Sequence, residues 1–190
     1  MSKLKHGFKA EAERISLRIR YKLGIPPTGR LDPEEVCRAF DITLLRMSDV
    51  DCDVSTFQGS ANDRFSAMTV CAGLQRGIVH NDSHHIFRQR SNIFHELAHC
   101  FLGHQGCTIL NDNGTRSYNS PIETEASYLG GALLLPKDAA LHILKNGLKS
   151  EAQNMYGVSR PMLEYRIRVS GAQTIFNRSL AKYGRSRPSY

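Results

Sequence analysis

Residues 91–104, SNIFHELAHCFLGH, decide how this chain is expected to fold and what chemistry it can hold. They contain the pattern H-E-x-x-H at residues 95–99, and apolar residues recur at helical spacings on both sides of it. Gly103 follows as a stop signal. With 8 histidines in the chain, the pattern is expected by chance in about 2% of sequences of this composition. The stretch therefore predicts a buried helix that begins near residues 81–83, whose side chains suit an N-cap.

The two histidines of the motif are placed to bind one metal ion. His95 and His99 are four residues apart, so their imidazoles share one face of a helix. Glu96 is rotated by about 100° from His95 around the helix axis, which places it beside such an ion. A general base for a zinc-activated water belongs there. The alternative is a set of core side chains held by hydrogen bonds, but a buried carboxylate without a nearby cation is costly.

A catalytic zinc needs a third protein ligand in addition to two histidines. The long form HExxHxxGxxH is excluded, because Gly103 and His104 stand in the wrong register for it. The better source is PIETEASYLGGALLLP, residues 121–136, which predicts a helix that Pro121 opens and Pro136 stops.

Two glutamates begin that second helix, and they point about 200° apart. Glu123 shares a face with Ala126 and Gly130, and small residues on that face would allow close approach to the motif helix. Glu125 remains the alternative ligand, or a side chain that orients a histidine from behind. Both could also be present only because acidic residues favour a helix N-terminus. We expect Glu123 to be the third ligand.

Elsewhere the pattern predicts helices at residues 9–23 and from Asp32, with Pro33 at the first helical position. Alternation around residues 65–71 and the run at 77–80 predict strands of a small antiparallel sheet. A polar loop is expected at residues 111–120, and short helices are expected in the last third. We therefore expect an α+β core over residues 1–140 and a helical C-terminal segment over residues 141–190.

Composition is that of a soluble globular protein, with 41% hydrophobic and 23% charged residues. No apolar run is long enough for a membrane span, and the charged start does not resemble a signal peptide, so we expect a cytoplasmic protein without membrane contact. The 5 cysteines form no CxxC pair. We expect them to be reduced rather than part of a disulfide framework or a Cys₄ zinc site.

The net charge of +7 is concentrated at the two ends of the chain, while the centre is acidic. Residues 152–168, AQNMYGVSRPMLEYRIR, have the spacing of a helix-turn-helix, with Gly157 at the turn and Ser159 as the next cap. DNA contact is one interpretation of this segment, and a helical support with a solvated basic face is the favoured one. The arginines of its second helix are Arg160, Arg166 and Arg168.

A zinc-activated water that attacks a carbonyl group also needs a donor for the developing oxyanion. The sequence offers several polar side chains near the motif and does not choose among them. They are His80, His84, His85, His104, Arg116, Tyr118 and Tyr128.

HELAHCFLGH, followed after a polar loop by ETEASYLGGALLLP, resembles the two motif helices of the ImmA/IrrE family of bacterial and phage metallo-endopeptidases. Leu129 and Gly130 depart from the usual Phe-Ala of the second motif, which concerns packing more than chemistry. The resemblance implies a zincin-like fold with Zn²⁺ bound by His95, His99 and Glu123 and with Glu96 as the catalytic base.

The same resemblance implies a substrate, namely a helix-turn-helix transcriptional repressor, and a role as an antirepressor in stress or mobile-element regulation. The alternative function is a non-proteolytic regulator that binds DNA or a repressor and in which zinc is structural. Metal content together with repressor cleavage separates the two hypotheses.

Overall fold

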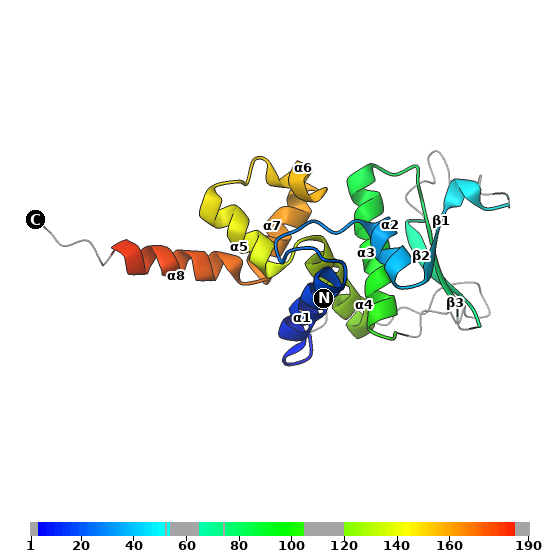
Figure 1. Cartoon of the computed structure of the whole chain (residues 1–190), viewed down its shortest axis with the longest axis horizontal. Coiled ribbons are helices and arrows are strands. Elements are labelled where there is room, and N and C mark those ends of the chain that lie inside the picture. The colour runs from blue at the N-terminus through cyan, green and yellow to red at the C-terminus, as the bar shows by residue number, and fades with distance from the viewer. Residues whose placement is uncertain (1–3, 52, 54–64, 74, 105–119, 185–190) are drawn as a thin grey trace, which may run out of the picture.

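A computed structural model of the chain describes residues 4–51, 53, 65–73, 75–104 and 120–184. Its small sheet lies at one end of the molecule and its C-terminal helices lie at the other (Figure 1). The predicted α+β class is confirmed. The elements are α1 (Phe8–Lys22), α2 (Pro33–Ala39), β1 (Ile42–Arg46), a 3₁₀ turn (Met47–Asp49), β2 (Ala67–Ala72), β3 (Gln75–His80), α3 (Ile86–Phe101), α4 (Ser120–Leu134), α5 (Lys137–Asn146), α6 (Ala152–Tyr156), α7 (Arg160–Val169) and α8 (Ala172–Gly184).

The sheet is mixed, with the order β1-β3-β2. β2 pairs antiparallel with β3, as predicted from the alternation around residues 65–71. β1 was not predicted, and it pairs in parallel with β3, with Ile42 opposite Arg76. The prediction of a purely antiparallel sheet is therefore wrong. Residues of β1 alternate only weakly, with Leu45 exposed, and their partner strand lies far along the chain, so no local pattern revealed the pairing.

The observed start of α2 agrees with the start predicted from the sequence, but that of α3 does not. Asp32 caps α2 through its carboxylate, and Pro33 occupies the first helical position. The motif helix α3 begins at Ile86, several residues later than predicted, and its N-cap is His85. Asn81 instead accepts hydrogen bonds within the turn before the helix. Its side chain suits a turn as well as a cap, which explains the misplaced boundary.

The core centres on the packing of α4 against α3 (Figure 1). Phe94 and Leu97 of α3 and Leu129 and Leu133 of α4 are fully buried. The opposite side of α3 contacts β2 and β3, while α1 covers α4. Almost every residue of α4 is apolar or small, which is typical of a helix surrounded by protein.

The buried C-terminal end of α4 is capped by side chains from other helices. A helix leaves its last carbonyl groups without intrahelical partners, and burial makes this costly. Here α1 and α7 supply the donors. Ser16 Oγ donates to the Ala132 carbonyl (2.7 Å), Arg20 Nη2 donates to that of Leu133 (2.7 Å), and Arg166 Nε donates to that of Leu135 (2.8 Å).

Arg166 is buried, although the sequence placed it among possible DNA contacts. Its side chain is fully enclosed, and its Nη2 donates to Glu13 Oε1 at 2.6 Å. The other carboxylate oxygen of Glu13 accepts from the backbone N–H of Lys137 at 2.8 Å. Arg166 therefore joins α7 to α1 and α5 and is not available to a nucleic acid.

The predicted turn between α6 and α7 is confirmed in its local geometry. Gly157 adopts the left-handed conformation with φ of 61°, and Ser159 Oγ accepts from the Met162 N–H at the start of α7. Arg160 and Arg168 are exposed on α7. The last helix, α8, extends away from the rest of the molecule (Figure 1).

Among the described cysteines, the chemistry differs from the expectation at Cys71. Cys71 is disulfide-bonded, so the prediction that all cysteines are reduced is wrong there. Cys37 and Cys100 are free and buried. Among the described residues, no helix combines the length and apolar character needed to span a bilayer.

Candidate metal centre

The α3 helix presents two imidazoles on one face. His95 and His99 are one turn apart, and their Nε2 atoms lie 3.1 Å from each other. The side chain of His99 is 2% exposed, whereas that of His95 is 27% exposed. The pair is therefore anchored in the core at His99 and reachable from solvent at His95.

The α4 helix brings the Glu123 carboxylate to the same point. Glu123 Oε2 lies 3.1 Å from His95 Nε2 and 3.5 Å from His99 Nε2. Hydrogen bonds from these two imidazoles hold the pKa of Glu123 well below its usual value, despite partial burial. The three side chains form a cluster of possible metal ligands whose donor atoms all lie within 4.8 Å of one another.

Close approach of α4 to α3 depends on Gly130. A Cβ atom at this position would lie 3.0 Å from the carbonyl oxygen of Phe94 and 3.1 Å from the Cα of His95. Both atoms belong to the backbone of the turn that carries the first histidine. The glycine that shares a face with Glu123 thus packs directly against α3, as the small-residue pattern predicted.

Gly130→Ala is expected to destabilise the metal-free protein by about 1–3 kcal/mol. The added methyl group would press against the backbone of α3, which cannot move aside as a flexible side chain would. It should also weaken zinc binding, since the displaced helix carries Glu123. Helix propensity alone predicts the opposite sign, a gain of about 1 kcal/mol. Urea unfolding and zinc titration measure the two effects, with Ser127→Ala on the same helix as the control. A more stable Gly130→Ala protein would refute the packing argument.

Glu96 is held by a threonine from the sheet. Its side chain is buried, and Thr69 Oγ1 donates a hydrogen bond of 2.7 Å to Glu96 Oε2. Thr69 lies on β2, which packs against α3. The sequence did not single out this threonine, although the strand alternation placed it on one face with Ala67 and Cys71. That alternation was the one sequence signal that could have pointed to Thr69.

Glu125 is not part of the three-residue cluster. Its carboxylate lies 3.5 Å from His104 Nε2 and 3.3 Å from Lys5 Nζ. His104 Nδ1 in turn lies 3.1 Å from His99 Nδ1. Burial and the neighbouring His99 lower the pKa of His104 below its usual value. The two glutamates of α4 thus have different partners.

The other residues considered as oxyanion donors occupy varied places. His80 is buried at the end of β3, and burial lowers its pKa. His84 is also buried, and His85 caps α3. Tyr128 is buried beside the ring of Phe8, with a centroid separation of 6.2 Å. Arg116 and Tyr118 lie outside the described residues.

The chemistry of the cluster fits a zinc ion. Ligand atoms that surround zinc tetrahedrally at about 2.0–2.1 Å are separated from one another by about 3.3 Å. The three separations in the cluster are 3.1, 3.1 and 3.5 Å. Two imidazole nitrogens and one carboxylate oxygen also form a donor set used by catalytic zinc sites, which keep a fourth position for water.

A helix with this donor set and an adjacent glutamate is the arrangement expected of a metallopeptidase. The chain belongs to the M78 peptidase family, whose IrrE N-terminal-like domain matches residues 37–168. This is a family of metallopeptidases, and the match runs from the end of α2 through α7. No curated protein sequence matches the chain significantly.

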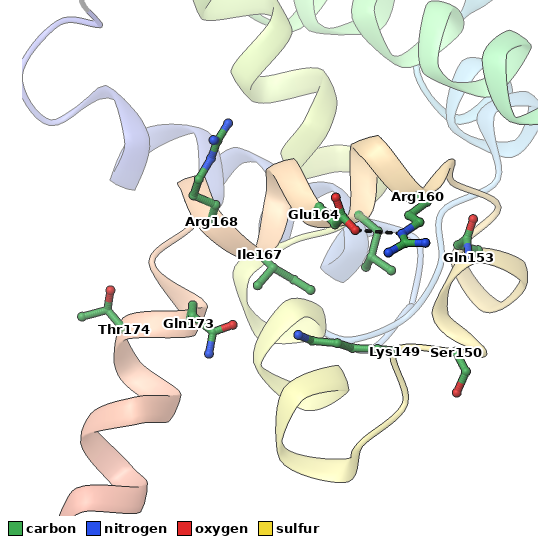
Figure 2. Close-up of a pocket in the computed structure, with 10 residues that line it drawn as sticks. Lys149, Ser150, Gln153, Arg160, Glu164, Ile167, Arg168, Gln173 and Thr174 are labelled. Atoms are coloured by element: carbon green, nitrogen blue, oxygen red, sulfur yellow. Dashed lines mark hydrogen bonds and ion pairs between the residues drawn. The ribbon is translucent and has the colours of Figure 1, made fainter.

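A hollow of about 760 Å³ lies on the C-terminal helices, away from the histidine cluster. Its walls are α6, α7, the start of α8 and the loop that follows α5 (Figure 2). Lys149, Arg160 and Arg168 line it, and Arg160 Nε is paired with Glu164 at 2.9 Å. The hollow shares no lining residue with the histidine cluster, so it is a separate surface, and its charged residues are mostly basic.

Proposed function

We propose that this protein is a zinc-dependent endopeptidase with a zincin-like active site. The observation that carries the proposal is the convergence of His95 Nε2, His99 Nε2 and Glu123 Oε2 from two helices. Membership of the M78 family supports the reaction class. In this proposal the three side chains bind Zn²⁺, and Glu96 is the catalytic base.

When bound, zinc supplies a Lewis acid that polarises a peptide carbonyl and lets water lose a proton near neutral pH. Glu96 accepts that proton on its carboxylate and later delivers it to the leaving amine. The Thr69 hydroxyl holds Glu96 Oε2 and thereby fixes the direction of the carboxylate. In the metal-free structure, hydrogen bonds from its histidine partners hold the pKa of Glu123 well below its usual value. As an ionised carboxylate it would supply the negative charge among the three ligands.

We propose a helix-turn-helix repressor as the substrate, on the basis of the resemblance of the motif helices to the ImmA/IrrE family. Cleavage would make the protein an antirepressor in stress or mobile-element regulation. The strand β2 lies at one edge of the described sheet and carries Thr69. An extended substrate segment can pair with such an edge through its main chain, which gives affinity with little demand on sequence.

The alternative function is a non-proteolytic regulator that binds DNA or a repressor and contains a structural zinc. The basic hollow of Figure 2 favours it, because exposed Lys149, Arg160 and Arg168 attract acidic or phosphate groups. The burial of Arg166 removes one arginine from any such contact.

The deciding experiment measures metal content and repressor cleavage on the same preparation. We expect about one zinc per chain, its loss in His95→Ala and His99→Ala, and cleavage of a purified helix-turn-helix repressor that a chelator abolishes. Mass spectrometry of the products would locate the cut bond. A protein that contains zinc and binds the repressor without cleaving it would favour the non-proteolytic regulator. Full retention of zinc in both histidine variants would refute the proposed zinc site.

A further inference from the structure

The end of α3 folds His104 back over His99. Gly103 has a φ of 64°, in the left-handed region. The His104 N–H donates to the His99 carbonyl at 3.1 Å, and the Gly103 N–H donates to the Cys100 carbonyl at 3.3 Å. These two bonds form a Schellman motif. As a result, the imidazole of His104 stands edge-on to that of His99, with ring centroids 5.1 Å apart.

A series of polar contacts connects His99, one of the three possible metal ligands, through the ring of His104 to Glu125 and Lys5. His99 Nδ1 meets His104 Nδ1 at 3.1 Å, and His104 Nε2 faces Glu125 Oε2 at 3.5 Å. Lys5 Nζ lies 3.3 Å from the other carboxylate oxygen. The imidazole of His104 is 12% exposed and the carboxylate of Glu125 is 8% exposed. Little water therefore competes with the contact between His104 and Glu125, whereas Lys5 itself is largely exposed.

Only one arrangement of protons satisfies this chain with neutral rings. A histidine that gives its Nε2 lone pair to a metal carries its proton on Nδ1. That N–H of His99 can donate to His104 Nδ1, which leaves the proton of His104 on Nε2, pointing at Glu125. The reverse assignment turns a lone pair of His104 toward the carboxylate, so two acceptors would face each other.

We propose that His104 and Glu125 form a positioning pair that holds His99 in the Nδ1–H tautomer, with Nε2 directed into the metal cluster. His104 is not itself a ligand, because it contacts the side of the His99 ring opposite to Nε2. The inference rests on the proposed zinc site and assigns the second glutamate of α4 a role in it. A carboxylate behind a metal-binding histidine raises the basicity of the ligand and fixes its orientation.

The test compares zinc affinities measured by chelator competition. His104→Phe, which keeps a ring without an acceptor, should lower zinc affinity by about 10–100-fold. His104→Gln should recover part of the loss, because its amide oxygen can accept from His99 Nδ1–H. Glu125→Gln should also weaken binding. Adding it to His104→Phe should cost nothing more, since the carboxylate acts through the imidazole.

Controls and a spectroscopic measurement separate positioning from general stability. His84→Phe alters a buried histidine elsewhere and should leave zinc affinity unchanged. The visible spectrum of the Co²⁺-loaded protein should change in His104→Phe and not in His84→Phe. If His104→Phe fails to fold, the zinc affinity of the isosteric Glu125→Gln variant decides whether the positioning pair exists.

The two ways of failing are distinct. Zinc affinities within about twofold of wild type in the folded His104 and Glu125 variants would overturn the positioning pair while the zinc site stands. A wild-type protein that binds no zinc would overturn both this inference and the proposed function.

Discussion

Glu96→Gln is expected to lower the rate of the proposed peptide cleavage by about 10²–10⁴-fold, the usual contribution of a general base. Glutamine has nearly the same volume and can still meet the Thr69 hydroxyl, but its amide cannot take a proton from water. Zinc content and the urea unfolding midpoint should therefore match the wild-type protein. The measurement is the initial rate of cleavage at equal zinc occupancy.

Thr69→Val provides the matched comparison for this variant. It keeps the side-chain volume on β2 and removes only the hydroxyl that donates to Glu96 Oε2. The loss of one hydrogen bond to a charged group predicts a reduction of about tenfold, well below that of Glu96→Gln. Near-wild-type activity in Glu96→Gln would show that another group accepts the proton.

Glu123→Gln is expected to lower zinc affinity by more than about 100-fold, beyond the effect of removing a group that only orients a ligand. The substitution removes the negative charge that two imidazoles now share, because Glu123 Oε2 lies 3.1 Å from His95 Nε2 and 3.5 Å from His99 Nε2. Chelator competition at fixed pH measures the change. Unfolding of the metal-free variant serves as the control for fold.

Glu125→Gln discriminates between the two glutamates of α4. Its effect on zinc affinity should be smaller, about tenfold, because its carboxylate contacts His104 and Lys5. A loss confined to Glu125→Gln would reverse the assignment. It would also mean that the face of α4 containing Gly130 does not deliver the ligand.

The elements of the cluster were predictable because their signals are local. The spacing of His95 and His99 and the glutamate that opens α4 follow from helical periodicity, which a short window of sequence contains. The close approach at Gly130 was also predictable, since a face of small residues has few other uses in a buried helix.

Features that depend on distant segments were not predictable. β1 pairs with a strand far along the chain, and Thr69 reaches Glu96 only because the sheet packs on α3. Arg166 looked like a basic surface residue, because its partner Glu13 lies near the other end of the sequence. His104 was noted as a possible oxyanion donor, but only the turn at Gly103 shows that it meets His99.

The capping of α4 by distant side chains also limits how the protein can be divided. A chain cut before α7 would lose Arg166, which would leave the Leu135 carbonyl without that donor and the mostly buried Glu13 carboxylate without its guanidinium partner. Because α4 also carries Glu123, this loss would destabilise the helix that supplies the third side chain of the histidine cluster. The part of the chain that carries the histidine cluster and the C-terminal helices should therefore unfold in a single cooperative transition, and neither is expected to be inherited or transplanted as a separate module.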